Sequence, residues 1–228
     1  AVGAESLFDP YCGTGTSLVE GMIRGLNVAG TDLNPLARLI AQAKISRPDP
    51  DQLDEQIAKF RRFASRSKLA RLSSAFSVAG IKRLDFWFKP SVIEKLSRIR
   101  EFIGGIKNDQ VRLFFQVAFS ETVRESSNTR NHEFKLYRYD ADALRLFRPR
   151  VFEIMMSKLA RNRDGLRKFL EAMRGTDNSL SAKVYDFNTA CGAPPELVPP
   201  ASVDIVVTSP PYGDSHTTVA YGQYSRLS

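Results

Sequence analysis

The feature that most constrains the fold is a glycine-containing loop close to the N-terminus. It reads Asp9-Pro10-Tyr11-Cys12-Gly13-Thr14-Gly15-Thr16. Residues 5–8 before the loop are typical of a buried strand, and apolar residues recur at helical spacing from Leu18 to Leu26. Glycines between a strand and a helix allow a tight turn and the close approach of a ligand. The segment therefore predicts the first strand–loop–helix unit of a Rossmann-like nucleotide site.

A second strand–helix unit follows at once. Residues 28–31 form an apolar strand ending in Asp32, and Asn34-Pro35 supplies an N-cap and first-turn proline for a helix to Ile45. A carboxylate in this place can accept hydrogen bonds from both ribose hydroxyls of an adenosine group. Position 18 is leucine rather than the third glycine of a dinucleotide fingerprint, which disfavours pyrophosphate. The alternative for Asp32 is a purely structural turn with Asn34.

Composition limits the class of protein. The 228 residues are 43% hydrophobic, enough for one sizeable core, and no apolar run approaches the roughly 20 residues of a membrane span. The first residues lack the pattern of a signal peptide, so we expect a cytoplasmic protein. Cys12 and Cys191 have no CxxC or histidine neighbours, and neither a disulfide framework nor a metal site is indicated.

The middle of the chain has a different character. Prolines at 48 and 50 break the alternation, after which helices are predicted over 52–72, 91–102, 110–124 and 149–173, with a polar loop over 126–139. Residues 46–182 carry 28 Lys plus Arg against 17 Asp plus Glu. This excess indicates a polyanionic partner, and the alternative is an ordinary solvated helical surface.

Strand character returns at residues 182–186 and again at 203–208. The last strand is nearly all β-branched, as expected for a strand covered on both faces, and leads into Ser209-Pro210-Pro211-Tyr212. Consecutive prolines fix the backbone, so that the Ser209 hydroxyl and the Pro210 carbonyl can accept both hydrogens of an exocyclic amine. Tyr212 could then stack on a base taken out of the helix. The alternative is a proline turn with a packed tyrosine.

The chain resembles a known family in three segments. Residues 9–16, 31–35 and 208–212 look like motifs I, II and IV of the amino-methyltransferases that make N4-methylcytosine or N6-methyladenine in DNA. The resemblance implies a seven-stranded methyltransferase fold, S-adenosyl-L-methionine as cofactor, DNA as partner and flipping of the target base. No membrane partner is expected, because no apolar run is long enough to span a bilayer.

The resemblance also assigns residues. The cofactor site would comprise Asp9, Pro10, Tyr11, Gly13, Gly15, Thr16, Asp32 and, at the end of the third strand, Asp186. The catalytic loop would comprise Ser209, Pro210, Pro211 and Tyr212.

Serine at the first catalytic position favours cytosine N4, because adenine N6 enzymes of the family usually carry Asp or Asn there. An adenine N6 DNA enzyme, an RNA base-amine methyltransferase and a truncated, non-catalytic nucleic-acid-binding fragment stay open as alternatives. A carbon-5 cytosine enzyme needs a Pro-Cys nucleophile, and Cys191 follows Ala190, which disfavours that mechanism.

We therefore expect an α/β Rossmann-like methyltransferase sheet with strand order 3-2-1-4, interrupted by a large helical insertion. Residues 1–45 and 183–228 would form the catalytic domain, and 46–182 a basic lobe for DNA recognition. Strands five to seven of the family are missing, so a C-terminal segment or a complementing chain would complete the enzyme. DNA contacts are expected from Arg124, Asn128, Arg130 and Lys135, since these residue types contact phosphates and base edges.

Overall fold

The computed structural model describes residues 3–66, 83–130, 136–177 and 179–209. These residues form two compact units. The first unit holds residues 3–47 and the described residues from 164 to 209, and the second holds the described residues from 48 to 163. The chain returns to the first unit at residue 164, inside a helix. The sequence analysis expected this return later, at residue 183.

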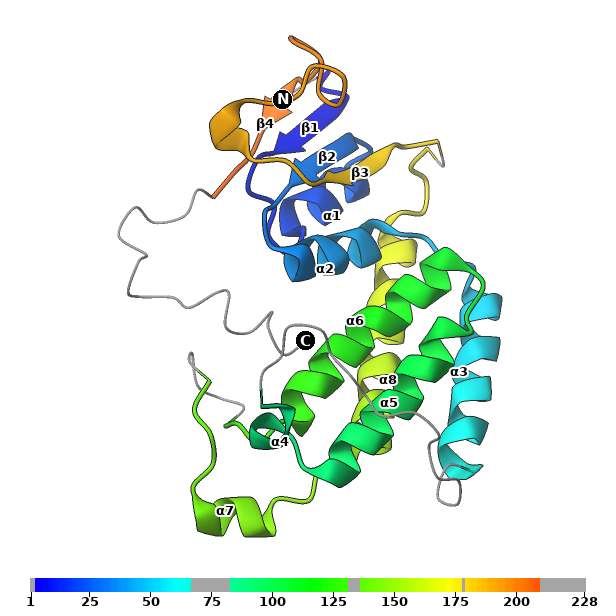
Figure 1. Cartoon of the computed structure of the whole chain (residues 1–228). Coiled ribbons are helices and arrows are strands. Elements are labelled where there is room, and N and C mark those ends of the chain that lie inside the picture. The colour runs from blue at the N-terminus through cyan, green and yellow to red at the C-terminus, as the bar shows by residue number, and fades with distance from the viewer. Residues whose placement is uncertain (1–2, 67–82, 131–135, 178, 210–228) are drawn as a thin grey trace. The chain divides into compact units, whose positions relative to one another are not determined.

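The first unit is built on a four-stranded parallel sheet (Figure 1). Its strands are β1 (Ser6–Asp9), β2 (Asn27–Thr31), β3 (Ala182–Tyr185) and β4 (Ile205–Val206). The order is β3-β2-β1-β4, with each neighbouring pair parallel, which confirms the predicted order. The chain therefore leaves the sheet after β2 and returns to pair β3 beside the same strand.

Helices α1 (Thr16–Ile23) and α2 (Pro35–Ile45) cover one face of this sheet (Figure 1). Leu18 and Met22 of α1 are fully buried, as their helical spacing predicts. The Asn34 side chain accepts a hydrogen bond from the Leu36 N–H at 3.0 Å and caps α2, with Pro35 as its first residue. Both predicted features of this helix start are confirmed.

The last strand differs from its prediction. Only Ile205 and Val206 form β4, and Val206 and Val207 are 62% and 45% exposed rather than covered on both faces. Within the described residues β4 pairs with β1 alone. Asp204 fixes the start of this pairing, because its Oδ2 accepts hydrogen bonds from the Glu5 and Ser6 N–H groups, each at 2.9 Å.

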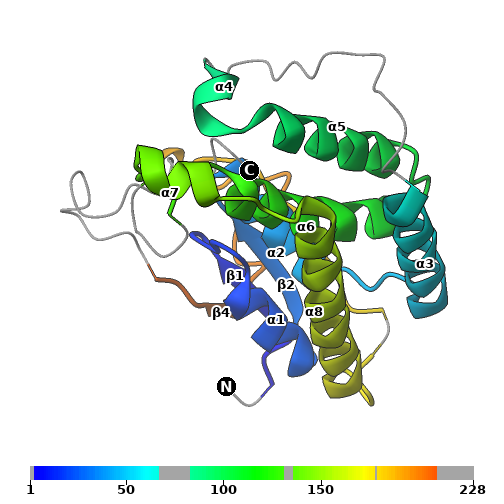
Figure 2. The same cartoon turned by 90° about the horizontal axis from the view of Figure 1, so that it is seen from below.

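The second unit is helical (Figure 2). It contains α3 (Pro50–Arg66), α4 (Leu84–Trp87), α5 (Pro90–Gly104), α6 (Asp109–Ser126), α7 (Ala141–Leu146) and the first part of α8 (Val151–Ala172). The four predicted helices are found within a few residues of their expected bounds, except that the predicted end of the first at 72 lies outside the described residues. A short 3-10 helix, η1 (Thr189–Cys191), belongs to the first unit. Among the described residues, no helix is long and apolar enough to cross a membrane.

An aromatic cluster forms the core of the second unit. Phe60 of α3 is fully buried, and its ring centroid lies 5.1 Å from that of Phe102 and 6.0 Å from that of Phe115. Both contacts are edge-on, a favourable arrangement for aromatic rings. Phe152 joins the cluster at 6.4 Å from Phe60. The cluster thus packs helices α3, α5, α6 and α8 together.

Candidate cofactor and catalytic site

The predicted site residues of the first unit follow the ends of its strands. Asp9 ends β1, Asp32 follows β2, Asp186 follows β3, and Ser209 comes three residues after β4. Because all four strands are parallel, these ends lie at one edge of the sheet. In open α/β sheets this carboxyl edge is where ligands bind.

Asp9 holds the glycine loop in shape. Its side chain is almost fully buried, and its Oδ1 accepts a hydrogen bond from the Tyr11 N–H at 3.0 Å. The Ser17 hydroxyl donates to its Oδ2. Asp9 therefore connects both ends of the loop between β1 and α1. Pro10, Tyr11 and Thr16 lie in this segment, with Tyr11 41% exposed.

The two glycines of the loop, Gly13 and Gly15, have different surroundings. Both have positive φ, 50° at Gly13 and 78° at Gly15. A Cβ at Gly15 would lie 2.9 Å from the Cβ of Ala41, so this glycine allows α2 to approach the loop closely. A Cβ at Gly13 would meet nothing within 4 Å. Gly13 therefore leaves open space of the kind that a ligand needs.

Asp32 joins the loop to the end of β2. Its Oδ2 accepts a hydrogen bond from the Gly13 N–H at 3.0 Å, and its Oδ1 accepts one from the Asn34 N–H at 2.8 Å. The turn with Asn34, which the sequence left open as an alternative, is thus present. The turn leaves some acceptor sites of the Asp32 carboxylate unused, because its two oxygens offer about four such sites. Half-buried Asp32 keeps capacity for ribose hydroxyls.

Arg38 is a site residue that the sequence reasoning missed. Its Nη1 donates to the Asp32 carbonyl at 2.7 Å, and its Nη2 donates to Asp186 Oδ2 at 2.7 Å. Its position four residues after the cap of α2 could have suggested a contact with the preceding loop. No local signal could have indicated Asp186, which lies 148 residues away.

Lys44, at the end of α2, was also missed. Its Nζ donates to the Thr14 hydroxyl at 3.3 Å. Burial lowers the pKa of this lysine. The contact brings a cation to the glycine loop, where it can complement an anionic group of a ligand.

The thiol of Cys12 has no nucleophilic character at neutral pH. It is 6% exposed, and burial, followed by the charges of Asp9 and Asp32, raises its pKa to about 12. Its backbone N–H donates to the Thr31 carbonyl at 3.0 Å, which ties the loop to β2. Cys12 is therefore a packing residue of the loop.

The catalytic segment begins beside β1. The Val207 N–H donates to the Phe8 carbonyl at 3.1 Å, and the exposed Ser209 follows two residues later. The other residues predicted for this loop, Pro210, Pro211 and Tyr212, lie outside the described residues.

The polar loop predicted over 126–139, from which DNA contacts were expected, lies in the second unit, and its first four residues are buried rather than exposed. Residues 126–129 are almost fully buried, with Asn128 at 2% exposed. The Asn128 side chain donates to the Phe86 carbonyl at 3.1 Å, and its N–H donates to the Trp87 carbonyl at 2.7 Å. Internal hydrogen bonds thus replace solvent for part of this segment, while Ser126 Oγ and Asn128 Oδ1 are buried without a hydrogen-bond partner among the described residues.

The charged residues of the segment differ from one another. Arg124 Nη1 donates to the Thr129 hydroxyl at 3.1 Å, which draws this arginine into the buried turn. Arg130 is exposed, and Lys135 lies outside the described residues.

A parallel sheet of this order, flanked by helices and carrying a glycine loop after β1, fits a Rossmann-like methyltransferase fold. Over 227 residues the chain is 40% identical to the Type II methyltransferase M.MvaI of Kocuria varians. The aligned region covers 98% of this chain and 50% of that protein, so the chain spans about half the length of the relative it matches. No family model and no solved structure matches the chain.

Proposed function

We propose that this chain is the cofactor-binding and catalytic part of a site-specific DNA methyltransferase that methylates an exocyclic base amine. The observation that carries the proposal is the bond between Asp32 and the Gly13 N–H, which joins motif-like segments at the carboxyl edge of the sheet. Similarity to a Type II methyltransferase supports it. Ser209 at the head of the catalytic segment favours cytosine N4 over adenine N6 as the target.

The residues present fit S-adenosyl-L-methionine. Asp32 has free acceptor sites for the ribose hydroxyls, and the space at Gly13 admits the ligand. Asp186 would accept from the adenine amine through the oxygen that does not bind Arg38. Lys44 would meet the carboxylate of the methionine part. When bound, the cofactor supplies an electrophilic methyl group on a sulfonium cation.

The chain's own contribution is positioning and polarisation. The Ser209 hydroxyl and the Pro210 carbonyl would accept the two amine hydrogens, which draws the nitrogen lone pair toward the methyl group. Tyr212 would stack on the flipped base. Neither a covalent enzyme intermediate nor a strong base is needed, because the amine nitrogen would bond to the methyl carbon as the carbon–sulfur bond breaks, and the methylated amine would then release one proton to water.

Calorimetry of cofactor binding tests the assignment of the site. We expect Asp32→Ala to abolish S-adenosyl-L-methionine binding, since it removes the ribose contact and releases the Gly13 N–H. Asp54→Ala is the matched control, because this aspartate pairs with Arg163 in the second unit. Tight binding by Asp32→Ala would contradict the proposal.

Mass spectrometry of nucleosides tests the reaction. DNA from cells that express the full protein should gain N4-methylcytosine. If N6-methyladenine appears instead, the target is the N6 amine of adenine. If RNA competes better than duplex DNA for methylation, the substrate is RNA. No modified base, with cofactor binding retained, would indicate a non-catalytic fragment.

A further inference from the structure

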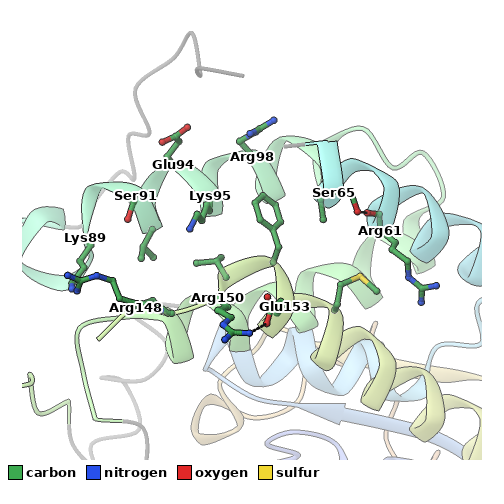
Figure 3. A pocket seen from close by; sticks show the side chains of 16 residues that line it. Arg61, Ser65, Lys89, Ser91, Glu94, Lys95, Arg98, Arg148, Arg150 and Glu153 are labelled. Atoms are coloured by element: carbon green, nitrogen blue, oxygen red, sulfur yellow. Dashed lines mark hydrogen bonds and ion pairs between the residues drawn. The ribbon is translucent and has the colours of Figure 1, made fainter. Parts of the chain in front are cut away.

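A basic groove lies in the second unit. It has a volume of about 970 Å³ and is lined by α3, α5, the start of α8 and the chain leading into α8 (Figure 3). Its two acidic residues are Glu94 and Glu153, and its six cationic residues are Arg61, Lys89, Lys95, Arg98, Arg148 and Arg150. The lining therefore has a strong excess of positive charge.

At one end of the groove, two cations lie beside each other. Lys89 and Arg148 are neighbours in Figure 3, and burial, followed by the charge of Arg148, lowers the pKa of Lys89. Lys89 Nζ donates to the carbonyls of Leu144 and Phe147 at 2.6 and 2.7 Å. Arg148 likewise donates to a carbonyl, that of Phe147, at 3.0 Å. Carbonyl partners fix these side chains without neutralising their charge.

Acidic residues compensate the rest of the groove only weakly. Glu94 and Arg98 both point away from α8 in Figure 3, whereas Lys95 points from α5 toward it. Arg150 pairs with Glu153 at 3.1 Å, and both side chains are well exposed, at 77% and 69%. Exposed pairs of this kind contribute little to stability, so Arg150 can exchange its carboxylate partner for a phosphate.

We propose that this groove binds the sugar–phosphate backbone of duplex DNA, an inference that rests on the proposed function. The cations are spread over both walls and both ends rather than converging on one point, which suits a chain of phosphates better than a single small anion. Lysine and arginine on a backbone position the duplex without reading its sequence. The groove would thus orient DNA, and bases would be read elsewhere.

Salt-dependent DNA binding by the full protein tests the groove. Lys95→Gln/Arg150→Gln should weaken binding to target and non-target duplexes alike. It should also make the slope of log K against log salt shallower by about 2, since each lost phosphate contact removes about 0.9. The matched control is Arg62→Gln/Lys107→Gln, which removes the same charge from exposed positions outside the groove lining. We expect this control to retain the wild-type slope.

A second variant guards against loss of folding. Glu94→Gln/Glu153→Gln removes the negative charge of the lining and should tighten DNA binding, an effect that an unfolded protein cannot produce. The inference is overturned if the groove variant and its control have equal slopes of log K against log salt. It is also overturned if the groove variant binds duplex DNA as wild type does and loses only the binding of duplex RNA. The proposed function has a separate readout in the same samples. Wild-type protein that neither methylates nor binds duplex DNA overturns that function, whereas unchanged variants of an active enzyme overturn only the groove.

Discussion

The guanidinium of Arg38 donates a hydrogen bond to the carboxylate of Asp186 at 2.7 Å. The same side chain donates to the backbone carbonyl of Asp32, and it is only 16% exposed. Arg38 therefore holds the end of β2 and the end of β3 at a fixed separation. We assign it a positioning role, because both Nη1 and Nη2 donate to groups within the protein.

Replacement of Arg38 should weaken cofactor binding without removing it. In Arg38→Ala, Asp186 loses its partner, and we expect the affinity for S-adenosyl-L-methionine to fall by up to about fivefold, since Asp186 is 69% exposed and an exposed ion pair contributes about 0.2–1 kcal/mol. Calorimetry measures this change. Arg38→Lys should recover part of it. The exposed Arg24, which pairs with Glu20 on α1, offers a control in Arg24→Ala.

The two loop glycines should respond differently to alanine. Gly15→Ala combines a φ of 78° with a contact of 2.9 Å to Ala41, and we expect a loss of about 3 kcal/mol or more in the free energy of unfolding. Gly13→Ala has only the backbone strain, about 1–2 kcal/mol. Urea denaturation measures both. If the two variants lose the same free energy of unfolding, then α2 moves to accommodate the added methyl group at position 15.

The thiols should differ in reactivity. Cys191 is exposed and Cys12 is buried with a pKa of about 12, so a thiol reagent at pH 8 should modify Cys191 rapidly and Cys12 only as the protein unfolds. Because the pKa of Cys12 is raised on folding above its ordinary 9.0, its contribution to stability is complete below pH 9 and is lost as the pH rises toward 12. Rapid modification of a Cys191→Ser variant would contradict the burial.

Asp204 should stabilise the protein above its own pKa and not below it. The Glu5 N–H and then the Ser6 hydroxyl hold the pKa of this carboxyl below its usual range. A depressed pKa stabilises the fold at neutral pH, and the contribution is lost as the pH falls below about 4 through the folded-state pKa. Asp204→Asn should therefore be less stable than wild type at pH 7. In acid denaturation the two curves should converge below pH 4, and a constant difference down to pH 2 would count against this role.

Much of the fold could be predicted because its signals are local. The glycine loop, the Asn34-Pro35 cap and the helical spacing of the middle segment each depend on residues within a few positions of one another. The strand order followed from the resemblance of these segments to a known family. The strand at 203–208 was predicted too long and too buried, because β-branched composition reports strand propensity and not the number of neighbouring elements.

The sequence by itself determined where the strands and glycines lie and that acids follow three of the strands. Tertiary structure decided which distant partners those acids have, whereas the turn of Asp32 with Asn34 was local enough to be considered from the sequence. Asp186 meets Arg38 across 148 residues, and Asn128 is buried against Phe86 rather than offered to solvent. It also decided that cations from α5 and from the chain before α8 line one groove. The physical reason is that hydrogen bonding and burial depend on distance in space, which residue spacing fixes only within a single helix, strand or turn.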